Sequence, residues 1–227
     1  MNDSIRLYAS EFIGTFFLVF AATGVVIVND MSGGAITHTG IAITTGLVVM
    51  AIVYAIGDVS GSHINPAVTV GFWLAGRFPG YRVIQYMASQ CLGAIAASLL
   101  LAFLFPDLIA LTVTLPSGPL MQSFILEIVI TMFLMFIILS VSTGSMEKGI
   151  MAGSAIGGVV GLSVLWAGPI TGASMNPARS IAPALVSLDF NSLWIYIAGP
   201  IIGAAISVIA FRIVHKPLTT GQERKDY

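Results

Sequence analysis

Two stretches of the chain share one pattern: SGSHINPAVT at residues 60–69 and GASMNPARS at residues 172–180. Asn is a preferred N-cap, and Pro suits the first position of a helix. Each stretch therefore predicts a helix that begins directly after its Asn. The apolar pieces that follow, 63–76 and 175–186, have the length of re-entrant half-helices rather than of membrane spans. The shared tripeptide consists of Asn65, Pro66 and Ala67 in the first stretch and of Asn176, Pro177 and Ala178 in the second.

The composition around these motifs is that of a membrane protein. Hydrophobic residues make up 57% of the 227 residues and charged residues 8%, whereas a soluble domain has about 25% charged residues. A spanning helix needs roughly 20 mostly apolar residues, and the first such segment has no small-residue cleavage site, so we interpret it as a permanent span. The sequence predicts an all-α membrane protein with six transmembrane helices and two half-helices. The predicted spans are 7–28, 39–57, 82–105, 120–141, 150–165 and 193–214.

The basic residues predict the orientation of these spans. Six spans place both termini on one side of the membrane, and Lys and Arg are enriched on the cytoplasmic side. Eight of the nine basic residues fall on one side of this topology, which predicts cytoplasmic termini in a multi-pass protein of the cell membrane. Only Arg179 departs from the rule. The eight are Arg6, Arg77, Arg82, Lys148, Arg212, Lys216, Arg224 and Lys225.

The two motifs lie in two halves of the chain that repeat one another. Each half has three spans, and Glu11 and Glu127 occupy equivalent early positions of the first span of each half. Because three is an odd number, the second half is expected to be inverted in the membrane, with a site near the midplane. We predict one domain over 1–227, with repeats 1–115 and 116–215 and a cytoplasmic tail at 216–227.

Inversion makes the two half-helices meet with their N-termini near the membrane centre. Irregular backbone at that depth is tolerated only where it lines a cavity or is buried in protein, so the two loops predict a polar path. Asn65 and Asn176 then offer N–H donors to that path, and the paired positive helix ends repel cations and protons.

The two motifs together resemble the paired signature of the aquaporin, or major intrinsic protein, family, and the similarity extends over residues 5–215. The resemblance implies a homotetramer in the lipid bilayer with one pore per subunit. The nodulin-like (NIP) subgroup and its bacterial relatives are more similar still, and they are associated with glycerol, urea and metalloid hydroxides such as boric, silicic and arsenous acid. The stretches that resemble this subgroup are GLVVM at 46–50, GRFP at 76–79 and AGPITGASM at 167–175.

The resemblance also implies a selectivity filter of four residues. Arg179 lies three residues after Asn176, and an Arg inside a membrane usually marks a solute pathway. Water-selective members of the family usually have Phe and His at two other filter positions, where smaller residues stand here. The filter is therefore expected to be wide and apolar on three sides. Its other members by the family's offsets, 20 residues before Asn65 and 12 and three before Asn176, are Thr45, Val164 and Ala173.

Four further ionisable residues allow two interpretations. Glu11 and Glu127 either form a proton relay with Asp58 or brace the re-entrant loops by accepting backbone hydrogen bonds. The family pattern favours bracing, and we assign the same role to His63. Many family members have His where this chain has Asp58, and the sequence offers no account of that difference.

These features predict a passive channel for small uncharged solutes and water that excludes ions and protons. The alternatives are a channel mainly for water and a proton-coupled secondary transporter. No nucleophile–base pair or metal cluster points to an enzyme, and no cofactor or metal is expected, with Cys91 the single cysteine. A net charge of −1 gives no basis for nucleic-acid binding.

Overall fold

The computed structural model describes residues 3–143 and 150–215, and these residues are helices joined by short connections. Six helices are long and apolar enough to cross a membrane. The six are α1 (Asp3–Met31), α2 (Thr37–Ser60), α4 (Val83–Leu104), α5 (Leu120–Val141), α7 (Ala152–Thr171) and α9 (Leu193–Val214). They run close to the predicted spans: α5 and α9 have the predicted bounds, α4 is one residue shorter at each end, and α1, α2 and α7 extend a few residues beyond at one or both ends.

The one large difference in boundaries is the end of α7. The prediction ended this span at residue 165, but the helix continues to Thr171 through Pro169. A proline inside a helix normally removes a hydrogen bond and displaces the carbonyl four residues earlier. Here that carbonyl, of Leu165, has another partner in His38, so the helix passes through the proline.

Two short helices follow the Asn-Pro-Ala motifs. They are α3 (Pro66–Leu74) and α8 (Pro177–Ser187). Each begins with Pro at its first position, directly after an Asn in extended conformation. Neither is long enough to span a bilayer. The one-turn helices η1 (Gly80–Arg82) and η2 (Ile109–Thr112) belong to connections.

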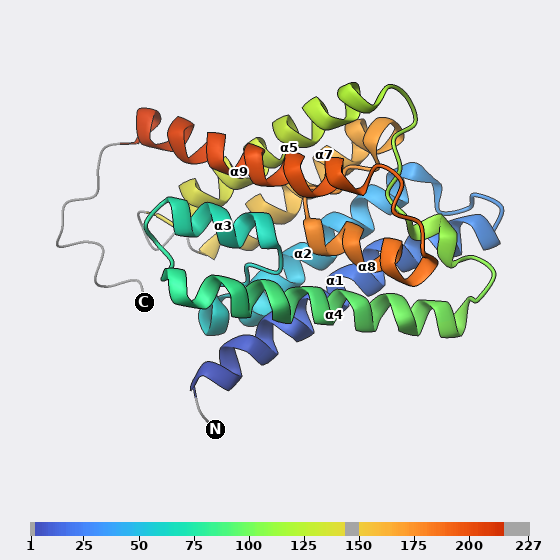
Figure 1. The fold of residues 1–227 in the computed structure, drawn as a ribbon, viewed down its shortest axis with the longest axis horizontal. Helices are drawn as coiled ribbons and strands as arrows, with labels where there is room; N and C mark the ends of the chain where they lie inside the picture. Colours follow the sequence, from blue (N-terminus) through green and yellow to red (C-terminus); the bar gives the residue numbers. More distant parts are fainter. Residues whose placement is uncertain (1–2, 144–149, 216–227) are drawn as a thin grey trace.

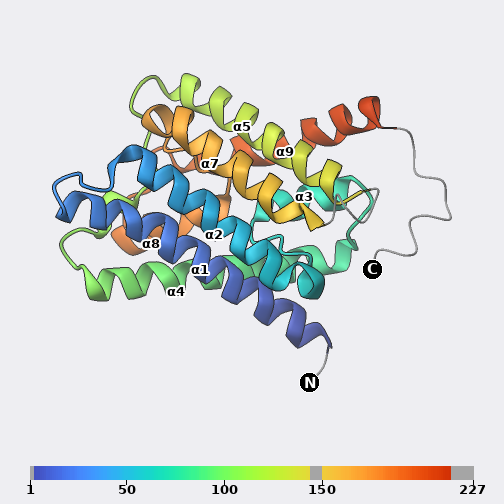
Figure 2. The same cartoon turned by 180° about the vertical axis from the view of Figure 1, so that it is seen from behind.

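The helices form one bundle in which the packing of the first half is repeated in the second (Figures 1 and 2). Helix α1 packs on α4 and α2, and α5 packs on α9 and α7. Each half-helix packs on the last long helix of the other half, α3 on α9 and α8 on α4. The halves meet along α2 and α7. Equivalent helices of the two halves thus have equivalent neighbours, and the inverted repeats 1–115 and 116–215 stay a prediction.

One end of the bundle carries the basic residues that the structure describes apart from Arg179. The start of α1, the segment between α3 and α4 and the end of α9 lie at the same end (Figure 1), and they contain Arg6, Arg77, Arg82 and Arg212. Arg212 there donates to the carbonyl of Leu74 at the end of α3, 3.0 Å away. The other basic residues used in the prediction, Lys148, Lys216, Arg224 and Lys225, lie outside the described residues, as does the predicted tail 216–227.

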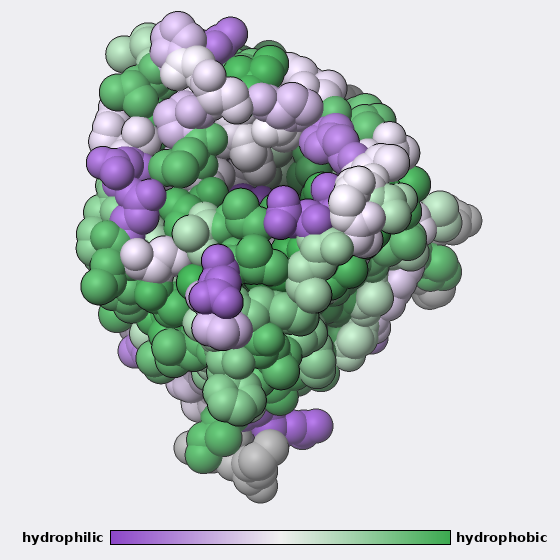
Figure 3. All heavy atoms as spheres, turned by 90° about the vertical axis from the view of Figure 1, so that its right-hand side faces the viewer, coloured by the Kyte–Doolittle hydropathy of each residue, from purple (hydrophilic) through white to green (hydrophobic). Residues whose placement is uncertain are grey.

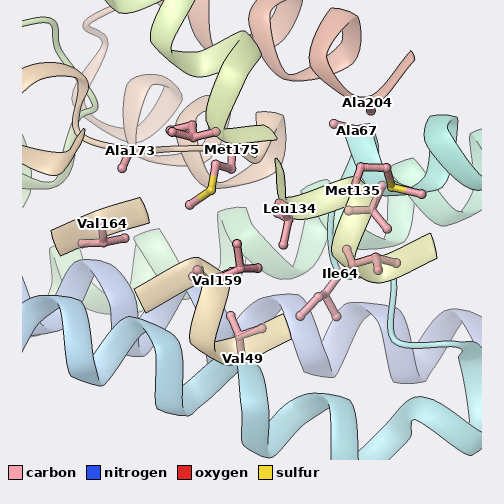
Figure 4. Close-up of a cluster of buried hydrophobic side chains, with 14 of the residues drawn as sticks. Val49, Ile64, Ala67, Leu134, Met135, Val159, Val164, Ala173, Met175 and Ala204 are labelled. Carbon is pink, nitrogen blue, oxygen red and sulfur yellow. The ribbon is translucent and has the colours of Figure 1, made fainter. Parts of the chain in front are cut away.

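The largest buried cluster lies between the two halves. It joins α2, α5 and α7 to residues of both re-entrant loops (Figure 4). Val49, Leu134 and Val159 come from the helices, and Ile64 and Met175 from the loops. The apolar residues therefore hold each loop against helices of both halves.

Glycines allow the helices of the two halves to approach closely along α2 and α7. A Cβ added to Gly157 would lie 2.5 Å from the carbonyl oxygen of Gly46 and 2.7 Å from the Cβ of Met50. A Cβ on Gly46 would lie 2.7 Å from the carbonyl oxygen of Gly157. Such contacts between small residues permit tight helix packing in membranes.

Gly157→Ala should therefore destabilise the protein. Its methyl group meets backbone on the facing helix and forces the helices apart, so we expect the free energy of unfolding to fall by about 1–3 kcal/mol. Gly57→Ala is the matched control, because a Cβ there meets nothing within 4 Å. Thermal unfolding of the purified variants in detergent measures the difference, and equal midpoints for the two would contradict the packing argument.

Candidate functional site

The two Asn-Pro-Ala motifs meet inside the bundle, and hydrogen bonds between their loops hold them together. The side-chain oxygen of Asn65 accepts a hydrogen bond from the N–H of Ala67 at 2.8 Å, and its Nδ2 donates to the carbonyl of Met175 at 2.7 Å. Asn176 accepts from Ala178 at 3.0 Å and donates to the carbonyl of Ile64 at 2.9 Å. Each Asn thus caps its own half-helix and forms a hydrogen bond with the loop of the other half.

Each Asn amide also retains a second N–H group. An amide nitrogen carries two hydrogens, and one hydrogen bond of each Nδ2 is found among the described residues. Both side chains line the same internal cavity. The two amides can therefore donate to a molecule in the cavity while their other bonds keep them oriented.

The loops before the half-helices have an unusual backbone. Ile64 and Met175 have φ values of 43° and 54°, and Ser62 and Ala173 have 48° and 43°. Residues other than glycine rarely adopt this left-handed backbone conformation. Each residue that does so lowers the stability of the fold by about 1–3 kcal/mol. The surrounding structure must hold these loops in place.

Glu11 holds the first loop. Its carboxylate is fully buried and accepts four hydrogen bonds. Two come from the backbone N–H groups of His63 and Ile64 at 2.9 and 2.7 Å. The others come from Ser60 Oγ at 2.7 Å and Gln90 Nε2 at 2.8 Å.

Glu127 holds the second loop in the same way. It is also fully buried, and it accepts from the N–H groups of Ser174 and Met175 at 2.9 and 2.8 Å and from Thr171 Oγ1 at 2.7 Å. These contacts are those that the predicted bracing role requires. Asp58, the third residue of the alternative relay, is exposed and does not line the cavity.

His63 is fixed by aromatic side chains. Its ring stacks on Phe72 with 4.6 Å between centroids and lies 4.7 and 5.1 Å from the rings of Phe78 and Tyr86. Its Nδ1 lies 3.1 Å from Thr69 Oγ1. His63 therefore joins the first loop to α3 and α4, as expected of a bracing residue.

The cavity at the centre of the bundle has a volume of about 70 Å³. Its walls come from both halves and are mostly apolar, with α2, α5 and α7 contributing Val49, Leu134 and Val160. Its polar groups are concentrated on the two loops, the Asn pair and Arg179. One end of the molecule is visibly hollowed, with hydrophilic side chains at the rim (Figure 3).

Arg179 lies on the first turn of α8 and lines this cavity. Its Nη1 donates to Thr114 Oγ1 at 3.1 Å, and Ser180 Oγ donates to the same oxygen at 3.0 Å. Its buried Nε has no hydrogen-bond partner among the described residues. Thr114 thus fixes the guanidinium through Nη1, while the buried Nε has no partner among the described residues.

Thr114 is a residue of the site that the sequence did not reveal. It lies in the connection before α5 and is 6% exposed, and it contacts Arg179 only because that connection folds over α8. No motif or spacing marks it, since a single Thr in a connecting segment is typical of turns.

The three other predicted filter residues are buried, and two of them line the cavity. Thr45 and Ala173 are 4% and 1% exposed and contribute to its wall. The hydroxyl of Thr45 donates to the carbonyl of Ile41 at 2.8 Å, within its own helix. Val164 is 4% exposed and follows Val160 by one turn of α7, but it is not among the residues that line the cavity. Its filter role stays a prediction.

The described residues contain no group of three or more His, Cys, Asp or Glu side chains that could hold a metal ion. The polar groups that face the cavity are amides, a guanidinium, hydroxyls, an imidazole and backbone groups. Such groups donate and accept hydrogen bonds, which suits the passage of a neutral polar molecule.

Comparison with known proteins agrees with this arrangement. The family model described as Major intrinsic protein matches residues 1–211. Aquaporin NIP1-4 of Oryza sativa subsp. japonica is 48% identical over 211 residues, which cover 92% of this chain and 77% of that protein. Aquaporin NIP1-1 of Zea mays is 45% identical over 224 residues, which cover 94% and 77%. The aquaglyceroporin from Plasmodium falciparum has the same fold, with a TM-score of 0.80 at 24% identity over 92% of this chain and 96% of that one.

Asn65→Asp tests the crosslink between the loops. The variant keeps the oxygen that caps α3 but replaces the N–H that donates to the Met175 carbonyl with a second acceptor. We expect the free energy of unfolding to fall by about 1–3 kcal/mol, because the buried carbonyl loses its donor. Asn191→Asp makes the same change at an exposed position and should have little effect. Thermal unfolding of both variants gives the comparison, and an unchanged Asn65→Asp midpoint would mean that the crosslink contributes nothing.

Proposed function

The chain belongs to the major intrinsic protein family, and we propose that it is a passive channel for water and small uncharged solutes such as glycerol, urea and metalloid hydroxides. It is a transport protein and not an enzyme. Flux through it follows the concentration gradient and uses no cofactor. The observation that carries the solute preference is the pairing of the Arg179 guanidinium with mostly apolar walls in one cavity.

That pairing suits a molecule with hydroxyl groups on a carbon or metalloid body. Hydroxyls accept from the guanidinium, while the body lies against apolar side chains. The methyl group of Ala173 and the small side chain of Thr45 leave room where a Phe at position 45 would occlude the path. The proposed outer filter consists of Thr45, Val164, Ala173 and Arg179.

Ions are excluded at the Asn pair. The N-termini of α3 and α8 meet there, and the positive ends of both helices raise the energy of a cation near the membrane centre. The amide N–H groups of Asn65 and Asn176 donate to the passing molecule, which fixes its orientation. A neutral solute exchanges hydrogen bonds along this path, whereas a cation loses its hydration.

The hydrogen bonds that Glu11 and Glu127 accept argue against a proton-coupled transporter. A relay needs groups that change partners, but Glu11 and Glu127 each accept two hydrogen bonds from backbone N–H groups of a re-entrant loop. Releasing either carboxylate would free a loop. The remaining alternative, a channel mainly for water, differs only in the width of the outer filter.

We also propose that both termini are cytoplasmic and that the protein forms a homotetramer in the cell membrane. The end of the bundle with Arg6, Arg77, Arg82 and Arg212 supports this orientation. The outer face of α2 and α7 forms an apolar groove that includes Thr39, Ser154 and Gly158. Small residues at such a face allow another helix to approach closely, which supports its burial against another copy.

Stopped-flow measurements on proteoliposomes test the proposed function. Vesicles that contain the protein should swell in response to gradients of glycerol, urea and boric acid, faster than empty vesicles and independently of a proton gradient. Water flux without flux of any of these solutes would favour the water channel. Accumulation of solute against its gradient would favour the transporter.

Substitutions in the outer filter should separate solute from water. The double variant Thr45→Phe with Val164→His narrows the ring to the size usual in water-selective relatives, so we expect glycerol flux to fall by about tenfold or more while water flux is retained. Ile13→Phe adds the same ring on the outer face of α1, where Ile13 is 48% exposed, and should leave both fluxes unchanged. Undiminished glycerol flux in the double variant would mean that these residues do not form the constriction.

A further inference from the structure

The proline in α7 leaves one backbone carbonyl without its helical partner. In an α-helix the carbonyl of Leu165 would accept from the N–H of residue 169, and residue 169 is Pro, which has none. The proline ring also displaces that carbonyl away from the helix axis. An unpaired carbonyl in a membrane-spanning helix is costly wherever water cannot reach it.

His38, near the start of α2, supplies the missing donor. Its Nε2 lies 2.9 Å from the Leu165 oxygen. A carbonyl oxygen only accepts, so Nε2 must carry the hydrogen, as it does in one neutral tautomer and in the protonated ring. The ring fits because the facing residue is Gly168, where a Cβ would lie 2.8 Å from Cε1 of His38.

This hydrogen bond joins the two helices that carry the filter residues Thr45 and Val164. Thr45 follows His38 on α2 by seven residues, two turns along the same face. On α7 the bonded carbonyl belongs to the residue directly after Val164. His38 therefore joins α2 to α7 one residue from Val164 on α7 and two turns, about 10 Å, from Thr45 on α2.

The neighbouring carbonyls of α7 have other partners. Ser117 Oγ donates to the carbonyl of Pro169 at 2.8 Å, and the N–H of Ser117 donates to the carbonyl of Ile170 at 2.9 Å. These bonds attach the connection before α5 to the end of α7. Of the bonds described here at this end of α7, only that of His38 reaches α2.

We propose that His38 is a positioning residue that sets the width of the outer filter by holding α7 against α2 through the carbonyl that Pro169 leaves free. The proposal rests on the proposed solute channel. Without the bond, the two helix ends separate and the ring widens on the side of Thr45 and Val164. The size limit for solutes then rises, while the Asn pair is unaffected.

The test compares His38→Leu with His38→Gln. Leu fills similar space without a donor, whereas the amide of Gln has N–H groups that can reach the same carbonyl. We expect the permeability ratio of a four-carbon polyol to glycerol to rise about threefold or more in His38→Leu and to return to within about twofold of wild type in His38→Gln, the size of effect that one hydrogen bond supports. A loss of folded protein alone lowers all fluxes together and leaves this ratio unchanged.

The Pro169→Ala background makes the test specific to the carbonyl. Alanine restores the N–H at residue 169, so Leu165 no longer depends on His38. The effect of His38→Leu, on both the permeability ratio and the midpoint of thermal unfolding, should then become smaller than in the Pro169 background. Equal effects in the two backgrounds would overturn the proposed link.

The two proposals fail in different ways. Wild-type vesicles without polyol flux would contradict the solute channel, and the unfolding midpoints would still report whether His38 and Pro169 are coupled. Wild-type polyol flux with an unchanged ratio in His38→Leu would overturn the positioning role and leave the channel intact.

Discussion

Backbone groups inside a bilayer have no water to bind, and this constraint explains the most unusual part of the structure. The loops that begin at Gly61 and Gly172 leave helical geometry at membrane depth, so each exposes N–H groups that need acceptors. Glu11 and Glu127 supply them from fully buried positions. The carboxylates and the N–H groups satisfy one another, and neither side of this arrangement is tolerable in the membrane without the other. The half-helices, the Asn pair and the cavity all depend on loops held in this way.

Three polar side chains of the cavity are each fixed by a hydrogen bond to another segment of the chain. Asn65 and Asn176 each donate one N–H to a backbone carbonyl of the opposite loop, and Nη1 of Arg179 donates to Thr114 Oγ1. These three side chains line a cavity whose other walls are mostly apolar. Groups that are fixed in this way lose little entropy when a solute arrives, so a weakly bound molecule can be selected and still leave quickly.

The sequence predicted the fold well because its signals are local. Apolar length and the capping residues Asn65 and Asn176 specify spans and half-helices without knowledge of the partner half. The misplaced end of α7 and the missed Thr114 have a common cause. Both depend on a contact between distant segments, His38 with Leu165 and Thr114 with Arg179, and a single sequence carries no local trace of either. The position of Val164 relative to the cavity depends on helix packing in the same way.

The reciprocal bonds of the Asn pair have a consequence for biogenesis. The ribosome releases the first half before the second exists, and at that stage Asn65 has no Met175 carbonyl to bind and Ile64 has no Asn176. The first loop can be braced by Glu11, but it cannot be completed. The first loop therefore reaches its final hydrogen bonding only when Met175 and Asn176 of the second half have joined it. The cavity too is complete only at that stage, because its walls come from both halves of the chain.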